Sequence, residues 1–240
     1  FCLLPSIDSQ SHPELLTRFR PDEVIAMDFE HQGLYTDNNT IKNACQIGGL
    51  ETLVLRECRE VTDESIAYID KLPNFKAIDV AISGVTLDGL LKLHRLRELQ
   101  RIGAKGYDAH RLLSALKGSQ ALTSLNLRFS DLSDDDMNLL AGLTKLRHLN
   151  ISGNKFTDKG FEKLSQLHQL NSLYAEGNRV SGAAAFAALS KLPLKQLHIT
   201  TTGWSSAALA KLKKALPNCQ MNVDTINEPN FAHPDFLEEH

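Results

Sequence analysis

The chain has 240 residues, of which 42% are hydrophobic and 23% are charged, and its formal net charge is −3. These values are close to those of folded globular domains and exclude a disordered chain, and the near-neutral charge argues against a broad nucleic-acid-binding surface. No apolar run approaches the ~20 residues that span a bilayer, so the sequence predicts no membrane insertion in this segment.

Residues 1–23 are predicted to form an N-terminal cap. Within them, residues 11–19 are typical of a short helix with Pro13 near its first position. Because the chain begins with Phe instead of Met, we expect an excised domain or a processed product. A stack of repeats needs such a cap, since its terminal core is otherwise wet. The residues expected to cover the first repeat are Leu15, Leu16 and Phe19.

The motif LxxLxLxxN recurs along the chain, and its clearest copy runs from Leu146 to Asn154. The frame starts at residues 24, 50, 75, 99, 122, 146, 170 and 194, so successive starts lie 26, 25, 24, 23, 24, 24 and 24 residues apart. A period held this closely over seven intervals predicts stacked structural repeats.

A second pattern follows each motif and predicts a helix. After Thr157 and Asp158, for example, Phe161, Leu164 and Leu167 recur every three residues, which is typical of a one-sided helix. The Ser or Thr suits an N-cap, and the Asp suits the positive end of the helix dipole. The motif itself alternates with period 2, as a short strand does. Each repeat is therefore predicted to be strand, turn, helix, turn.

Stacked repeats of this kind place strands about 4.8 Å apart and helices about 10 Å apart, so we expect a curved stack with its sheet on the concave side. The Asn that ends the motif is expected to bond backbone groups in the turns of its own and the adjacent repeat. Ser, Thr or Cys can partly replace it.

These repeats resemble leucine-rich repeats, and their length of about 24 residues with a Thr-Asp pair resembles the bacterial and F-box-associated varieties. Residues 212–221 resemble the closing strand of such bacterial arrays. The resemblance covers residues 24–223 and implies an α/β leucine-rich-repeat solenoid, or horseshoe, of about eight repeats plus a closing strand. Its parallel strands would line the concave face, and its helices the convex face. The fourth repeat departs from the pattern at Gly103, Ala104, Gly106 and Tyr107, which puts its strand geometry in doubt.

Residues 224–240 contain two prolines and an acidic end, and are predicted to form a C-terminal cap that runs into a loose tail. No linker divides residues 24–223, so they are predicted to be one structural domain. The four cysteines contain no CxxC pair, and their scattered positions favour buried free thiols, although their even number permits disulfides. Asn38-Asn39-Thr40 and Asn150-Ile151-Ser152 match the glycosylation pattern, but such triplets often arise by chance.

The sequence offers no motif for catalysis or for a cofactor. Gly48-Gly49 precedes a strand instead of opening a helix, and no Ser lies in a GxSxG turn. His148 and His198 would lie on strands two apart, roughly 10 Å from each other, which is too far for shared metal ligation. The run Asp134–Asp136 resembles a calcium loop in isolation, but carboxylates at a helix N-terminus are the favoured interpretation. We predict no catalytic residue, no cofactor and no metal.

Side chains at positions 3, 5 and 7 of each motif are predicted to point away from the core, because positions 4 and 6 point into it. They form a predicted basic patch and a predicted polar-aromatic column (Asn126, Asn150, Tyr174 and His198). Phe129, at a strand exit, is expected to be part-exposed or to pack on the adjoining repeat, and Trp204 is expected to pack in the core. The predicted binding residues are Arg101, Lys105 and Arg128 of the basic patch, with Asn126, Phe129, His148, Asn150, Tyr174, Glu176 and His198.

We interpret the chain as a non-enzymatic, monomeric protein- or peptide-binding module that uses its concave face. The resemblance implies that such a module is the recognition domain of a larger protein. One alternative is the substrate-recognition arm of a ubiquitin ligase, but residues 1–23 are too short for an adaptor-binding domain. Another is an enzyme with a concave-face site, which the lack of an acid/base or nucleophile cluster disfavours. A solvated strand face is the structural alternative, because any such stack exposes polar residues there.

Overall fold

The computed structural model describes residues 2–3, 12–20, 23–30, 35–201 and 204–224. These residues group into two compact units that divide between Gly103 and Ala104, within the fourth repeat. Unit 1 comprises the described residues up to Gly103, and unit 2 those from Ala104 onwards. The division falls in the repeat that departs most from the sequence pattern.

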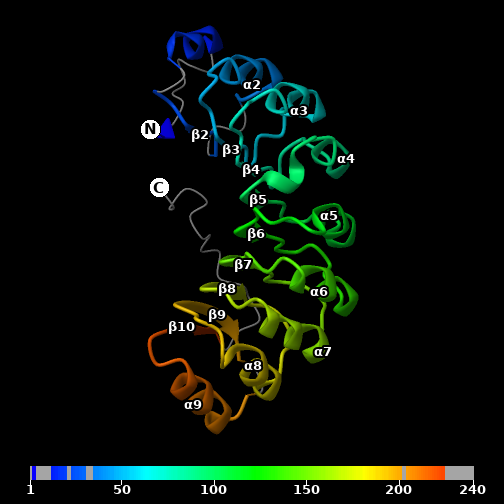
Figure 1. The fold of residues 1–240 in the computed structure, drawn as a ribbon, viewed down its shortest axis with the longest axis vertical. Helices are drawn as coiled ribbons and strands as arrows, with labels where there is room; N and C mark the ends of the chain where they lie inside the picture. The colour runs from blue at the N-terminus through cyan, green and yellow to red at the C-terminus, as the bar shows by residue number, and fades with distance from the viewer. Residues whose placement is uncertain (1, 4–11, 21–22, 31–34, 202–203, 225–240) are drawn as a thin grey trace. The chain divides into compact units, whose positions relative to one another are not determined.

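Unit 1 is a stack of parallel strands with helical segments along one side of them (Figure 1). Its strands are β1 (Cys2–Leu3), β2 (Ala26–Asp28), β3 (Thr52–Val54), β4 (Ala77–Asp79) and β5 (Arg101–Gly103). Its helical segments are the 3-10 helix η1 (Pro13–Arg18), α2 (Asn38–Ala44), η2 (Asp63–Ser65), α3 (Ile66–Ile69), α4 (Leu87–Leu90) and η3 (Leu96–Glu98). Neighbouring strands pair at equivalent motif positions, so Asp79 lies opposite both Val54 and Gly103.

Unit 2 repeats the same arrangement. Its strands are β6 (Ser124–Asn126), β7 (His148–Asn150), β8 (Ser172–Ala175), β9 (Gln196–Thr200) and β10 (Gln220–Asp224). Its helical segments are α5 (Ala109–Leu116), α6 (Asp134–Ala141), α7 (Asp158–Phe161), η4 (Glu162–Gln166), α8 (Gly182–Leu189) and α9 (Ser206–Ala215). β10 pairs in parallel with β9 and confirms the predicted closing strand.

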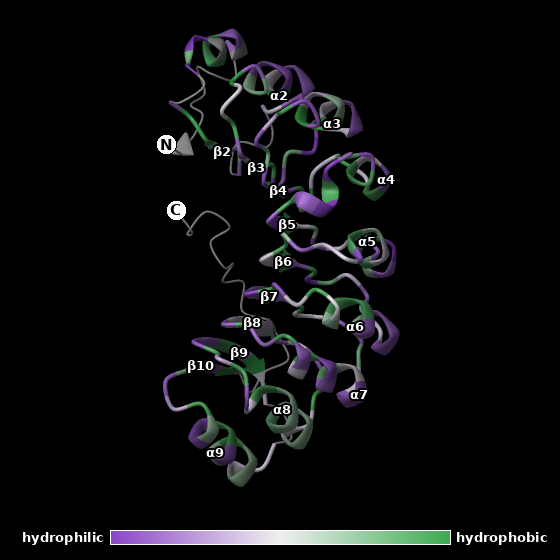
Figure 2. Ribbon diagram, in the orientation of Figure 1, coloured by the Kyte–Doolittle hydropathy of each residue, from purple (hydrophilic) through white to green (hydrophobic). Residues whose placement is uncertain are grey.

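The leucine frame forms the core of both units. Motif residues such as Leu53, Leu125 and Leu149 are buried, and each contributes roughly 1.5–3 kcal/mol by leaving water. Figure 2 shows hydrophobic residues where helices and strands face each other, and hydrophilic residues on the outer turns of α6 and α7. Among the described residues, no helix is both long and apolar enough to cross a bilayer.

The N-terminal residues differ in two respects from the sequence prediction. β1 pairs with β2 and adds a strand ahead of the first repeat, which two residues could not reveal by periodicity. The predicted short helix is the 3-10 helix η1, in which Leu16 is buried. Phe19, however, is exposed, because η1 ends at Arg18 and Phe19 continues with an extended backbone.

The motif Asn residues link neighbouring repeats, as predicted. Nδ2 of Asn154 donates to the carbonyl oxygens of Leu127 in the preceding repeat (2.9 Å) and of Ile151 in its own (2.8 Å). Cys58 occupies the equivalent position in unit 1, and its thiol donates to the carbonyl of Phe29 at 3.6 Å. Each such bond satisfies a buried backbone group that the turn leaves without a partner.

The Ser133-Asp134 pair caps α6 and also binds the next repeat. The carboxylate of Asp134 accepts the backbone N–H of Thr157 (2.8 Å) and of Gly160 (3.0 Å) in the following repeat. Asp136 forms a capping box with Ser133 at the start of α6. The helix-terminus interpretation of the run Asp134–Asp136 is therefore confirmed. Gly160 is needed here, because a Cβ on it would lie 2.4 Å from a carboxylate oxygen of Asp134.

Candidate binding surface

The polar-aromatic column lies on consecutive strands of unit 2. The register places Asn126 opposite Asn150, Asn150 opposite Tyr174, and Tyr174 opposite His198. The closing strand extends this column by Asn222, opposite His198. Sequence analysis missed Asn222, although continuing the repeat frame by another 24 residues leads to it.

Tyr174 and His198 form the most ordered part of the column. Their rings stack with centroids 4.2 Å apart and planes 17° from parallel. Nδ1 of His198 lies 3.4 Å from a carboxylate oxygen of Glu176, and Nε2 lies 3.2 Å from the amide nitrogen of Asn222. The same amide nitrogen lies 3.3 Å from Nδ1. The imidazole therefore contacts the ring of Tyr174 on one face and also lies against Glu176 and Asn222, which restricts its rotation.

Asn126 and Asn150 have a structural role that the sequence analysis did not predict. Each side-chain oxygen accepts the backbone N–H two residues further on, from Arg128 (3.1 Å) and Ser152 (3.0 Å) respectively. Both side chains are buried. They thus shape the strand exits as well as lining the face, and burial of Asn150 in the sheet leaves no room for a glycan on that residue.

The other glycosylation triplet is also engaged within the fold. The side-chain oxygen of Asn38 accepts the backbone N–H of Thr62 at 2.9 Å, and its Nδ2 donates to Oγ1 of Thr62 at 2.8 Å. Asn38 therefore joins the first two repeats of unit 1, and a glycan on its amide would break that connection.

Phe129 is the large apolar side chain that unit 2 exposes at a strand exit, with 41% of its surface accessible. Cζ of Arg128 lies 4.8 Å from its ring centroid, and Nζ of Lys105 lies 5.7 Å from it. The ring also covers Gly153 in the next repeat, where a Cβ would stand 2.1 Å from a ring carbon. Both expectations for Phe129 are confirmed, because it packs on the adjoining repeat and remains part-exposed.

The predicted basic patch divides between the two units. Lys105 and Arg128 share the Phe129 ring in unit 2, where burial lowers the pKa of Arg128 and the charge of Glu176 raises it. Arg101 belongs to unit 1, and its guanidinium donates to Oγ1 of Thr52 at 3.1 Å. The patch as a set of three thus remains a prediction.

The two remaining predicted binding residues also lie in unit 2. His148 lies half-buried on β7, and Glu176 is buried beside His198.

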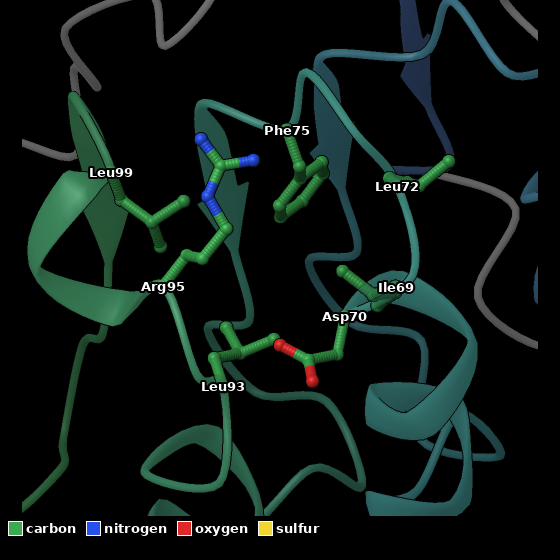
Figure 3. Close-up of a pocket in the computed structure, with 7 residues that line it drawn as sticks. All are labelled: Ile69, Asp70, Leu72, Phe75, Leu93, Arg95 and Leu99. Atoms are coloured by element: carbon green, nitrogen blue, oxygen red, sulfur yellow. The ribbon is translucent and has the colours of Figure 1, made fainter.

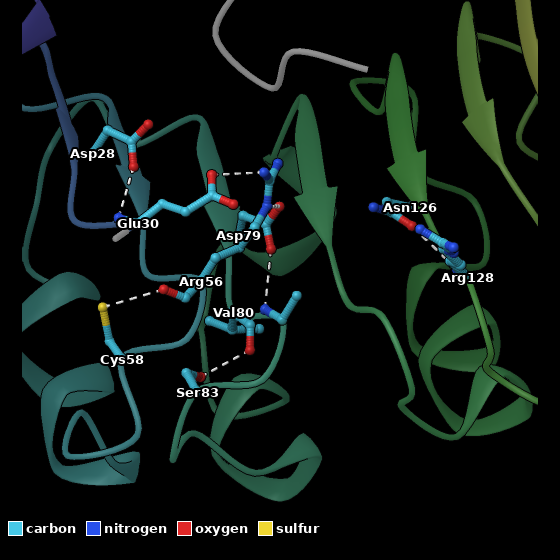
Figure 4. A network of polar contacts seen from close by, with 10 residues as sticks. Asp28, Glu30, Arg56, Cys58, Asp79, Val80, Ser83, Asn126 and Arg128 are labelled. Atoms are coloured by element: carbon cyan, nitrogen blue, oxygen red, sulfur yellow. Dashed lines mark hydrogen bonds and ion pairs between the residues drawn. The ribbon is translucent and has the colours of Figure 1, made fainter. Parts of the chain in front are cut away.

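Unit 1 carries a charge network on its strand face that the sequence analysis did not single out. Nε of Arg56 lies 2.7 Å from the Asp79 carboxylate, and Nη1 lies 2.8 Å from the Glu30 carboxylate (Figure 4). Burial alone would lower the pKa of Arg56, but the charges of Asp79 and Glu30 raise it. The signal was available, because Glu30, Arg56 and Asp79 occupy positions 5 and 7 of successive motifs.

An apolar cleft of about 10 Å³ in unit 1 lies beside Phe75, Leu93 and the Arg95 side chain (Figure 3), and is far smaller than the ~300–1,000 Å³ of typical ligand pockets. In the described part of the chain, no three His, Cys, Asp or Glu side chains converge as metal ligands would. Trp204 is half-buried and donates to the Val180 carbonyl at 2.7 Å, so its packing role is only partial.

The comparisons with known proteins agree with this architecture. Residues 120–180 match the family model for leucine rich repeats. The fold is similar to an internalin (inlF) from Listeria monocytogenes, with a TM-score of 0.54 at 20% identity over 78% of this chain and 57% of that one. It is also similar to internalin C2 from the same organism, with a TM-score of 0.52 at 22% identity over 77% of this chain and 74% of that one. No curated protein sequence matches significantly. At these identities the structural likeness concerns the fold alone.

Proposed function

Because this chain is a leucine-rich-repeat protein, we propose that it is a protein- or peptide-binding module that uses the strand face of unit 2. Proteins with this fold commonly bind other proteins. The observation that carries the proposal is Phe129, an aromatic side chain that is 41% exposed and is held between Gly153 and two cationic side chains. Aromatic residues are enriched at the cores of protein interfaces. Arg128 is buried beneath the ring and supports it, whereas Lys105 is half-buried.

Preorganisation supports the same proposal. The Tyr174–His198 stack and the Asn126 and Asn150 bonds to the backbone fix the orientations of the column before any partner arrives. Side chains that are already ordered lose little entropy on binding, so more of the contact energy becomes affinity. In this arrangement the buried side chains of the column form a rigid surface. The accessible contacts include Phe129, the half-buried Lys105 and His148, and the exposed Asn222.

The test is a selection of peptides from a random display library on the immobilised wild-type protein, followed by affinity measurements with purified variants. Lys105→Glu combined with His148→Ala should weaken binding by about tenfold or more, as loss of interface-centre contacts does. The matched control is Lys159→Glu with His110→Ala, which changes the same residue types at exposed positions on α7 and α5. The proposal fails if no peptide binds, or if the control pair weakens binding while the strand-face pair does not.

A further inference from the structure

Positive charge gathers along one edge of unit 2, where the chain passes from each helix to the next strand. The five loops there contain five Lys or Arg residues and no Asp or Glu. Because the strands of unit 2 are parallel neighbours in one sheet, these loops end along the same edge of it, which we call the entry edge. The loops are residues 117–123, 142–147, 167–171, 190–195 and 216–219, and the cations are Lys117, Lys145, Arg147, Lys191 and Lys195.

The five cations are open to solvent. Each of these residues is exposed, and within the described part of the chain none of their side chains is seen in an ion pair. In the equivalent connections of unit 1, carboxylates accompany the cations. Lys76 pairs with Glu51 at 2.7 Å, and Arg95 pairs with Glu98 at 2.6 Å. The repeat therefore accepts acidic residues at this edge, and folding does not require the positive charge of unit 2.

Stabilisation of the helix ends does not account for these charges. A cation stabilises the negative end of a helix dipole within about the last turn, yet α6 and α8 have no basic residue in that turn. Lys145 and Arg147 follow the end of α6, and Lys195 immediately precedes β9. These three cations lie beyond the reach of the dipoles, so their charge is available to a partner.

The residues between the cations offer no apolar or aromatic anchor. Every leucine of the five loops is buried, and the loops contain no Phe, Tyr or Trp. Protein interfaces centre on buried aromatic and aliphatic anchors, and single-stranded nucleic acids stack on aromatic rings. A partner of the entry edge is therefore recognised by its charge.

The distribution of charge favours a broad, flat partner that lies on one side of unit 2. Because the whole chain has a formal charge of −3, the part outside the entry edge is net negative and repels a polyanion that surrounds the protein. Arg147 and Lys195 hold the same motif position on strands two apart, roughly 10 Å from each other. The cations thus form a spread field, of which the curved side of a nucleic-acid duplex would meet only a part. A plane of acidic lipid headgroups meets all of it.

We propose that the entry edge of unit 2 binds peripherally to an anionic membrane surface, with its five cations against the acidic headgroups. The contact involves no insertion, because the described loops of this edge expose no large apolar side chain. The inference is independent of the proposed function, which uses a different surface, the strand face.

The test is co-sedimentation of the full chain with vesicles of phosphatidylcholine, alone or mixed at about 3:1 with phosphatidylglycerol. We expect binding to the acidic mixture only, and its loss when salt is raised from about 0.1 M to about 0.5 M. Lys145→Gln combined with Arg147→Gln and Lys195→Gln should weaken binding about a hundredfold, since each cation near such a surface contributes about fivefold.

The matched control combines Lys155→Gln, Lys159→Gln and Arg179→Gln. It removes the same charge from exposed positions on the opposite, strand-to-helix side of unit 2, and should bind within about twofold of the wild-type protein. Both triple variants change exposed residues, so their thermal midpoints should stay close to that of the wild type.

Equal loss of vesicle binding in the two triple variants would overturn the inference, because net charge instead of the entry edge would then explain binding. Absence of binding to the acidic vesicles would overturn it as well. A labelled DNA duplex and a labelled poly-glutamate peptide are titrated in parallel. If either binds more tightly than the vesicles and loses affinity in the entry-edge variant, the edge serves that class of partner and the membrane inference is wrong. Peptides selected for the strand face should bind the entry-edge variant normally, so these outcomes leave the proposed function unaffected.

Discussion

Gly103 lies directly against the carboxylate of Asp79 on the strand face of unit 1. A Cβ added to Gly103 would stand 2.2 Å from Cγ of Asp79. One oxygen of that carboxylate accepts the backbone N–H of Ala81 at 3.0 Å, and the other binds Arg56. The irregularity of the fourth repeat therefore has a local cause, because the absent side chain at Gly103 provides the space that the buried carboxylate occupies.

Gly103→Ala is expected to lower the free energy of unfolding by about 2 kcal/mol, within the usual range for overpacking a buried site. The carboxylate cannot move aside without losing its bond to Ala81 or to Arg56. Denaturant unfolding of Gly103→Ala, Asp79→Ala and the double variant measures the coupling between the two sites. The penalty at Gly103 should shrink when Asp79 is already Ala. An equal penalty in both backgrounds would contradict the steric explanation.

Arg56→Met should destabilise the protein more than Asp79→Asn does. Removing Arg56 leaves the carboxylates of Asp79 and Glu30 without their shared cation in a buried setting, which costs about 3–5 kcal/mol in comparable cases. Asn at position 79 keeps an oxygen that can accept the Ala81 N–H, so Asp79→Asn should lower the free energy of unfolding by less. Denaturant unfolding of the two single variants gives the order, and a larger loss for Asp79→Asn would refute it.

Local patterns in the sequence predicted the repeat well, because its elements depend on spacing and residue type over a few positions. The strand frame, the Asn154 bonds and the capping of α6 by Ser133 all follow from such rules. The closing strand followed as well, since Met221 continues the alternation seen in Leu197 on β9.

The partners of side chains on the strand face could not be predicted in the same way. Asn126 and Asn150 were expected to face a ligand, yet their oxygens bind the backbone two residues on, a choice that depends on the strand-exit geometry. The sequence alone allows Arg56 to pair with several acidic residues. In the structure, the strand register and the space left by Gly103 place Asp79 and Glu30 beside Arg56. The left-handed backbone at Phe129 likewise has no signal in the hydrophobic pattern.

Asp134 should make the stability of the protein depend on acid pH. Burial alone would raise the pKa of Asp134, but the hydrogen bonds from Thr157 and Gly160 outweigh it and lower the pKa. Because the pKa is lower in the folded state, the stabilisation is present above about pH 4–5 and is lost as pH falls through the folded pKa. Asp134→Asn should therefore reduce stability at pH 7 and flatten its decline in acid.

The matched control for this effect is Asp135→Asn, which removes the same charge from the same exposed turn of α6. Unfolding free energies measured by denaturant titration at intervals from about pH 7 to pH 2 give both profiles. Asp134 makes hydrogen bonds to the next repeat and Asp135 is not seen to make them. Only Asp134→Asn should therefore change the slope of unfolding free energy against pH. Parallel profiles for Asp134→Asn and the wild-type protein would show that these bonds do not shift the pKa.

Thiol reactivity should distinguish the folded from the unfolded protein. Cys45, Cys58 and Cys219 are free, as the sequence predicted, although only Cys58 is fully buried. Burial raises the pKa of Cys45 to about 12, and burial together with nearby carboxylates raises that of Cys58 to about 12. At pH 8 almost no thiolate forms at either residue, so alkylation by iodoacetamide should be slow until denaturant is added. Peptide mapping by mass spectrometry follows each cysteine separately. Rapid alkylation of Cys58 in the native protein would contradict the prediction, because it would mean that the turn holding Cys58 opens readily.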